Sequence, residues 1–438
     1  MAKPKLALIP AAQGTKLYSV LPSNGTGDFT FTRGSVATRI NAQGLIENVA
    51  SGQSRLNYPL IDGVQKGCPH HILEPARTNV VQYSEDFLNG FVLSRTSAFG
   101  SGSEINNVIS PEGSLNGSYI QQASGETSGG GVFNTFSYIN GTTYTISIFA
   151  KKKENRYIRL GAGIGGGGAA VFCGFDLQDG LVGSPNTGVT GKIENYGNGW
   201  YRCSITLVSQ VTLSRNTFFY QSSNLNSFIT TPLNGIYIWG ASVEVGSFPT
   251  SYIPTNGESG GVTRSAETAT GAGNSTTFND SEGVLFAEFN TLSINPASSR
   301  YIGISNGSAD NRIAIRQLGG ANNQVGGFVV VGGSVQANLI STINLVNFNK
   351  IAVKYKANDF ALWVNGIELA TDTSGTVPAE GTLNKLDFAN FNGSSLPFEG
   401  KTKQVQYFDS ALADTQLEQL TSWQSFRDMA EGQLYTIE

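Results

Sequence analysis

The sequence predicts an all-β protein with two β-sandwich (jelly-roll) domains that follow an irregular, β-containing N-terminal segment. Apolar and polar residues alternate with a period of two in several stretches, most clearly over 350–364. Turn signals rich in Gly and Asn recur about every ten residues, as in sandwiches. No long stretch carries a helical apolar period, and 438 residues suffice for two or three domains.

The composition narrows the class of protein. The chain holds 54 Gly and is 10% aromatic, but only 14% of its residues are charged, against about 25% in an average soluble protein. A β-rich chain with an uncharged polar surface is typical of extracellular and virion appendage proteins. The net charge of −4 argues against a nucleic-acid partner, which would favour a clustered basic stripe.

Cysteine content and hydropathy add two further expectations. Three cysteines, an odd number, argue against a disulfide framework, and no stretch approaches the roughly 18 apolar residues of a membrane span. The short apolar run at the N-terminus is cut by Pro10, so we expect no signal peptide. An appendage-like chain without a secretion signal suggests release by cell lysis.

Residues 1–84 form the first segment, with short strands predicted at 29–32 and 37–40. It resembles a cassette that recurs in tail-fibre and other structural proteins of tailed bacteriophages. The matching residues are Thr32-Arg33, Ser35, Ala37-Thr38-Arg39, Asn41, Gly44 to Glu47, Leu73-Glu74-Pro75, Arg77-Thr78-Asn79 and Tyr83 to Phe87. The resemblance implies a virion protein. Because this segment has few apolar residues of its own, we expect it to be a virion-attachment and oligomerisation element. It should be buried against the second domain (residues 85–255), a sister subunit or a virion partner.

Residues 85–255 are predicted to form the first sandwich. Strands are expected at 143–150, 198–207 and 235–244, and Tyr144, Ile146, Ile148 and Cys203 should point into the core. The motifs Gly197-Asn-Gly-Trp-Tyr-Arg202 and Tyr237-Ile-Trp-Gly-Ala241 resemble a carbohydrate-binding-module jelly roll of the kind found in phage fibres. The resemblance implies glycan binding.

Residues 256–277, rich in Gly, Ser and Thr, are predicted to be a linker between independently folding units, and residues 278–424 the second sandwich. Strands at 283–289 and 350–364, the Asn365-Gly366 hairpin turn and a closing helix from 414 resemble a concanavalin/laminin-G-like domain. Thr415 and Glu418 suggest a capping box for that helix, with Asp414 an alternative N-cap. Residues 425–438 are expected to be a C-terminal tail.

The sequence offers little for catalysis, and we expect no enzyme activity and no catalytic residues. The two histidines, His70 and His71, are adjacent, and zinc-binding spacings are missing. The glycines at 161–166 match a dinucleotide fingerprint, but a strand rather than a helix should follow them, so no nucleotide cofactor is expected. A glycan hydrolase needs two carboxylates roughly 5–10 Å apart, and no strand supplies them in the usual pattern.

Two kinds of binding site stay open. Asn306, Asp310 and Asp359 offer oxygen ligands for Ca²⁺, although ordinary polar turns are the favoured interpretation. Four aromatic side chains are candidates for stacking on sugars, with core packing the alternative for each: Trp200, Tyr237, Trp239 and Tyr301. Trp363 poses the same choice, and we expect it to pack against the closing helix.

Together these features predict a bacteriophage virion structural protein, a tail fibre or other surface appendage that binds host-surface glycans non-covalently. A capsid-surface head fibre or decoration protein is one alternative, and a glycan hydrolase is the other. The expected partners are other virion proteins, host glycans and further copies of the chain, with a trimer favoured because linked weak sites gain avidity.

Overall fold

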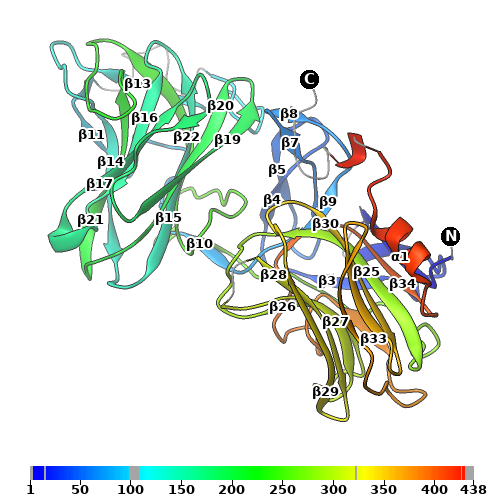
Figure 1. Ribbon diagram of the computed structural model, residues 1–438. Coiled ribbons are helices and arrows are strands. Elements are labelled where there is room, and N and C mark those ends of the chain that lie inside the picture. The colour runs from blue at the N-terminus through cyan, green and yellow to red at the C-terminus, as the bar shows by residue number, and fades with distance from the viewer. Residues whose placement is uncertain (1–2, 14–15, 98–107, 321–322, 426, 430–438) are drawn as a thin grey trace.

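The computed structural model describes residues 3–13, 16–97, 108–320, 323–425 and 427–429. Its chain forms two β-sandwich bodies joined through N-terminal segments, which lie at their junction (Figure 1). The predicted all-β fold class is confirmed: the structure is mostly strand, in antiparallel sheets.

The first body consists of two six-stranded sheets packed face to face. One sheet contains, in spatial order, β11 (Val92–Ser94), β14 (Gly131–Tyr138), β21 (Leu213–Ser222), β16 (Tyr157–Ala162), β17 (Val171–Asp176) and β18 (Leu181–Val182). The other contains β12 (Thr96–Ser97), β13 (Ser118–Gln122), β22 (Gly235–Val245), β15 (Thr143–Lys152), β20 (Trp200–Val208) and β19 (Val189–Gly197). The predicted inward residues Tyr144, Ile146, Ile148 and Cys203 are all buried between the sheets.

The second body packs a five-stranded sheet against an eleven-stranded one. The smaller sheet contains β29 (Ser334–Thr342), β28 (Gln324–Val331), β27 (Arg312–Gln317), β26 (Arg300–Ser305) and β33 (Lys385–Asp387). The larger contains β24 (Thr268–Thr270), β3 (Phe29–Thr32), β2 (Lys16–Leu21), β1 (Leu6–Gln13), β34 (Gly400–Phe408), β25 (Glu282–Thr291), β30 (Asn349–Lys356), β31 (Phe360–Val364) and β32 (Ile367–Asp372), while β9 (His70–Leu73) joins β34 and β6 (Leu56–Asn57) joins β9.

Part of the N-terminal segment belongs to the second body, the C-terminal sandwich, which was not among its predicted burial partners. Strand β1 pairs with β34, and β3 pairs with β24. Leu6, Leu8 and Phe29 are buried in the same core as the C-terminal strands. The surface that this segment needs is therefore supplied by the C-terminal sandwich of its own chain, and its burial does not require a sister subunit.

The predicted linker over 256–277 is wrong for the same reason. It contains β23 (Val262–Arg264), which pairs with β10 (Arg77–Asn79), as well as β24 of the large sheet. Ala269 and Ala272 lie in the core of the second body. The small polar residues that suggested a flexible linker are residues of short edge strands and turns.

The remaining N-terminal strands cover the first body. Hairpins form between β4 (Ala37–Ile40) and β5 (Ile46–Val49), and between β7 (Leu60–Ile61) and β8 (Val64–Gln65). Ile46 packs with Phe149, Trp200, Trp239 and Tyr252 in a separate apolar cluster. The N-terminal segment thus closes the outer face of the β12–β19 sheet.

The closing helix α1 (Asp414–Thr421) covers the outer face of the large sheet (Figure 1). Its N-cap is Ala413, whose N–H donates to Gln416 at 3.1 Å, so the predicted capping box of Thr415 and Glu418 lies two residues too late and the alternative N-cap Asp414 one residue too late. The predicted hairpin turn is confirmed, because Asn365 and Gly366 have φ of 51° and 87°. Of the expected tail 425–438, residues 426 and 430–438 lie outside the described part of the chain.

We expect Trp363→Ala to lower the free energy of unfolding by about 3–5 kcal/mol, because a large buried side chain would leave a cavity under α1. Trp363 is 7% exposed and clusters with Leu417 and Leu420 of the helix. Chemical denaturation measures the change. Ile367→Ala is the control, since Ile367 is 61% exposed on the next strand and should change stability by less than about 0.5 kcal/mol. Equal effects of the two substitutions would contradict the packing.

Candidate functional site

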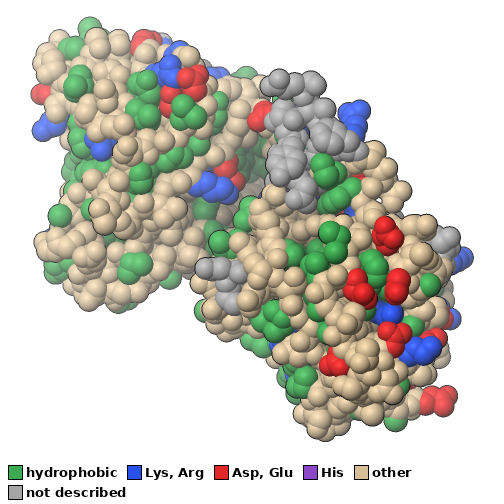
Figure 2. Space-filling model, in the orientation of Figure 1, with side chains coloured by type: hydrophobic (Ala, Val, Ile, Leu, Met, Phe, Trp, Pro, Cys, Tyr) green, Lys and Arg blue, Asp and Glu red, His purple; other side chains and the backbone are tan. Residues whose placement is uncertain are grey.

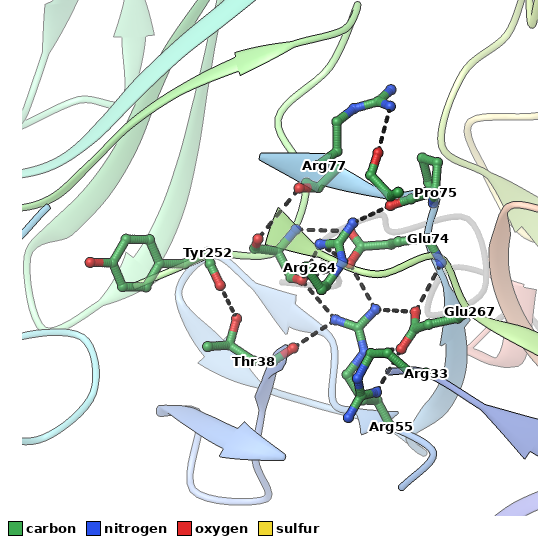
Figure 3. Close-up of polar contacts among 12 residues, drawn as sticks. Arg33, Thr38, Arg55, Glu74, Pro75, Arg77, Tyr252, Arg264 and Glu267 are labelled. Carbon is green, nitrogen blue, oxygen red and sulfur yellow. Dashed lines mark hydrogen bonds and ion pairs between the residues drawn. The ribbon is translucent and has the colours of Figure 1, made fainter. Parts of the chain in front are cut away.

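A buried network of five charged side chains lies where the two bodies meet (Figure 3). Its members are Arg33, Arg55, Glu74, Arg264 and Glu267, whose side chains are at most 2% exposed. Arg55 is central, because its guanidinium contacts both carboxylates and donates to Glu74 at 2.8 Å. Glu267 also accepts from Arg33 at 2.8 Å. Every charge is therefore paired, as burial requires.

The network also bonds to backbone of the N-terminal segment and of the first body. Arg55 donates to the Thr38 carbonyl at 2.7 Å, and Thr38 donates to the carbonyl of Tyr252 at 2.5 Å. Ser251 donates its N–H to Glu74 at 2.8 Å. Glu74 and Thr38 are among the motif residues singled out in the sequence, and at these two positions they form hydrogen bonds at the junction.

The pKa values follow from this pairing. Burial alone would raise the pKa of Glu74, but the guanidinium groups of Arg264 and Arg55 hold it well below its usual value. Burial alone would lower the pKa of Arg55, whereas Glu267 and Glu74 raise it. Both shifts stabilise the charged forms, so the network contributes stability at neutral pH that is lost as acid protonates Glu74.

We expect Glu267→Gln to destabilise the protein by about 3–5 kcal/mol, because it leaves two buried arginines with too little negative charge. Because the network spans the junction, both bodies should become more susceptible to proteolysis at their shared boundary. Denaturation with limited proteolysis tests this, and Glu258→Gln, at an exposed position, serves as the matched control. A stability change as small as that of the control would show that the network does not hold the junction.

A cleft of about 670 Å³ lies where the two bodies and the N-terminal segment meet. A recess separates the bodies in the space-filling view (Figure 2). Tyr58, Tyr196 and Phe248 are half-buried in its wall. Lys192 in the cleft wall pairs with Glu194 at 2.8 Å, so these two opposite charges offset each other. The cleft is a polar crevice able to admit a small ligand.

A second surface lies on the outer face of the sheet that contains β14, β21, β16 and β17. Strand pairing places Phe133, Phe218, Gly161 and Phe172 in one row across these four strands. Between ring centroids, Phe172 lies 5.5 Å from Phe218 and 4.8 Å from Phe228. The centroid of Tyr220 lies 5.3 Å from that of Phe218. The side chains are half-buried, so they offer ring surface to a ligand. We call Phe133, Phe172, Phe218, Tyr220 and Phe228 the aromatic face.

Glycine makes the row possible. A Cβ atom on Gly161 would stand 2.2 Å from the Phe172 ring, so only glycine lets that ring lean over β16. In the sequence, Gly161 stands out only as part of the glycine run that matches a dinucleotide fingerprint. A one-turn 3-10 helix at Gly166–Gly168 is followed by the expected strand, β17. Polar groups border the row, since Thr135 donates to Asn216 at 2.8 Å on the neighbouring strands.

The structure corrects most of the predicted sugar-stacking residues. Trp200 and Trp239 are 1% and 0% exposed, because the N-terminal segment and Tyr252 cover the sheet face on which they lie. Tyr301 is 5% exposed under Leu396 and Phe328. Tyr237 alone stays half-buried, beside Tyr119 at 5.5 Å. Three of the four rings therefore lack the free face that stacking requires.

The structure also shows the surroundings of the residues considered for metal binding and acid–base chemistry. Among the described residues no group of three or more His, Cys, Asp and Glu could hold a metal ion. Asp359 pairs with Lys354 at 2.7 Å, and Asn306 accepts from Ser308 in a polar turn. His70 and His71 are buried, and burial lowers the pKa of His71 to about 3.

Glu85 and Glu112, which the sequence did not single out as a pair, lie close together beside a pocket. Asn116 donates to Glu85 at 3.0 Å and to Glu112 at 2.7 Å, so the two carboxylates lie less than about 6 Å apart. They line a pocket of about 650 Å³. Burial, with the charge of Glu112, raises the pKa of Glu85 to about 7, although Tyr252 donates to it at 2.9 Å. Glu85 and Glu112 do not lie on one strand, so the spacing of acidic residues along the sequence did not reveal the pair.

We expect Glu85→Gln to stabilise the protein at pH 8, by roughly 1–2 kcal/mol given its partial exposure. A carboxyl whose pKa is raised from 4.5 to about 7 binds a proton more tightly when folded. Its contribution to stability therefore falls as the pH rises from about 4.5 to about 7. Denaturation of both proteins across this range isolates the effect. A constant difference between them at all pH values would contradict the shifted pKa.

Comparisons with known proteins show a likeness of fold. No protein-family model matches the sequence, and neither does any curated protein. The CBM40 domain of a Ruminococcus gnavus IT-sialidase is similar over 35% of this chain and 94% of its own, with 19% identity and a TM-score of 0.30. A Limulus polyphemus SAP-like pentraxin is similar over 33% of this chain and 72% of its own, with 13% identity and a TM-score of 0.27.

Domain 4 of AbnA, a GH43 extracellular arabinanase from Geobacillus stearothermophilus, was solved in complex with arabinotriose. It is similar over 36% of this chain and 73% of its own, with 12% identity and a TM-score of 0.30. The likeness in each case covers about a third of the chain. No helix among the described residues is long and apolar enough to cross a membrane.

Proposed function

We propose that the protein is a structural component of a tailed-bacteriophage particle, a tail fibre or other surface appendage, that binds host-surface glycans non-covalently. The observation that carries the glycan-binding part is the aromatic face. Sugar rings have apolar C–H faces that pack on aromatic rings, while their hydroxyls need hydrogen-bonding groups at the edges. Phe172, Phe218 and Tyr220 supply the first, and Thr135 and Asn216 the second.

The phage part of the proposal is supported by the cassette and the composition. Two cassette residues are buried at the junction of the two bodies, where Glu74 accepts from Arg55 and Thr38 donates to the carbonyl of Tyr252. The proposed place of action is the virion surface, with other virion proteins as partners. A homo-oligomer, with a trimer favoured, would raise the avidity of shallow sites by about 10²–10⁴. A capsid-surface head fibre or decoration protein would use the same surface.

We propose that the protein is not an enzyme, and one observation keeps the hydrolase alternative testable. Glu85 and Glu112 share Asn116 at a spacing that a retaining glycosidase could use. Incubation with bacterial surface polysaccharides, followed by measurement of new reducing ends, distinguishes the two functions. Release of reducing ends that is lost in Glu85→Gln would establish hydrolysis, and unchanged polysaccharide is the expected result.

We expect Phe218→Ala to weaken binding to host cells and to their extracted polysaccharide by about tenfold, the equivalent of roughly 1.4 kcal/mol of lost ring contact. Phe218 is the centre of the aromatic face, in contact with Phe133, Phe172 and Tyr220. Biolayer interferometry on immobilised polysaccharide measures the loss.

Two variants complete the test. Val208→Ala, at a position 50% exposed on the opposite sheet, should bind as the unmodified protein does. Tyr58→Ala changes the wall of the cleft instead. Weakened binding in Tyr58→Ala with full binding in Phe218→Ala would move the site from the aromatic face to the cleft.

A further inference from the structure

Arg159 has a buried charge without a counter-charge. It lies on β16, on the outer side of the sheet, and is only 7% exposed. Within the described part of the chain its guanidinium makes no hydrogen bond or ion pair, and its Nε–H is buried without an acceptor. Buried arginines are normally paired, because the desolvation of an unpaired charge is costly. Burial accordingly lowers the pKa of Arg159.

The aromatic face holds this side chain in place. The guanidinium carbon lies 3.9 Å from the centroid of the Phe228 ring and 5.5 Å from that of Phe172. Strand pairing puts Arg159 between Tyr220 and Gly174 in the row next to the aromatic one. A Cβ on Gly174 would stand 1.8 Å from the carbonyl oxygen of Leu225, so the loop that carries Phe228 closes over the sheet here. Two rings orient the cation, but neither neutralises it with a formal charge.

Two other arginines near aromatic rings have hydrogen-bond acceptors, and Arg312, which lies 5.2 Å from the Phe328 ring, is half-buried rather than buried. Arg316 lies 4.0 Å from the Phe328 ring in the second body, but it donates to Asn338. Arg202 lies 5.4 Å from Phe149 and donates to the Thr250 carbonyl at 2.6 Å. In contrast to Arg316 and Arg202, Arg159 has guanidinium N–H groups without an acceptor among the described residues. A guanidinium edge with two free N–H groups matches a carboxylate or a phosphate, which can accept both bonds at once.

We propose that Arg159 is an anion subsite within the aromatic face, and that the ligand of this face is an acidic glycan. The carboxylate or phosphate of one sugar would accept hydrogen bonds from Arg159, while neighbouring sugar rings stack on Phe172 and Phe218. This inference rests on the proposed function and adds the chemical class of the ligand. It also assigns a specificity-determining role to Arg159, since a neutral glycan would leave the cation unpaired.

Two matched pairs of immobilised polymers test the proposal with the full chain. One pair is polygalacturonate and its carboxyl-reduced neutral form, and the other is a phosphomannan and its dephosphorylated form. We expect the charged member of at least one pair to bind at least tenfold more tightly than its neutral partner. Which pair shows the difference distinguishes carboxylate from phosphate. Raising the salt concentration should weaken the charged interaction alone.

Three variants assign the preference to the side chain. Arg159→Gln should abolish it, and Arg159→Lys, which keeps the charge without the planar fork, should restore part of it. Arg316→Gln removes a similar ring contact in the other body and should leave the preference unchanged. Thermal melting of each variant confirms that it is folded.

The failures of the two proposals are distinguishable. Equal binding of charged and neutral polymers, or a preference that persists in Arg159→Gln, would overturn the anion subsite. So would failure to bind all four polymers while host-cell binding remains sensitive to Phe218→Ala, although glycan binding would then stand. Sedimentation that shows Arg159→Gln to dissociate a homo-oligomer would assign the face to a second copy of the chain and would also overturn the subsite.

Discussion

The buried ion network is the constraint on which the arrangement of the molecule depends. Arg55 sits between Glu74 and Glu267, and none of the three can change position without leaving a charge unpaired in a dry interior. These residues come from parts of the chain about 200 residues apart. A shift of one member would leave a charge unpaired, so the network constrains how the bodies meet together with the hydrophobic contacts of the N-terminal segment. The cleft and its lining are consequences of that fixed junction.

The same constraint explains why the N-terminal segment has no core of its own. Its apolar strands complete the large sheet of the second body, while its hairpin at β4–β5 covers tryptophans of the first. The N-terminal segment is therefore buried against both bodies, and we call it the clasp. Its buried charged residues are paired where the two bodies meet. The cassette resemblance therefore has a physical content: Arg33, Thr38 and Glu74 are the residues that such a clasp needs.

Local signals in the sequence predicted local structure well. The alternation at 143–150, the Asn365-Gly366 turn and the closing helix were all found, because each depends on neighbours within a few residues. Long-range pairing was not predictable. Arg264 and Glu267 lie in a polar stretch that has the composition of a linker, and only their partners from the N-terminal segment make them interior. Burial of Trp239 depends equally on Ile46, almost 200 residues away.

The candidate site follows the same rule. Phe133, Phe172 and Phe218 lie in three unremarkable stretches, and only the register of four strands puts them in one row. Trp200 and Trp239 were better candidates by residue type, but the outer face of their sheet is covered by the clasp. The opposite sheet of that sandwich stays open for the same geometric reason, since the clasp can cover only one side. The face left open is the one that carries Arg159, so the junction that buries the tryptophans also decides which aromatic residues can meet a ligand.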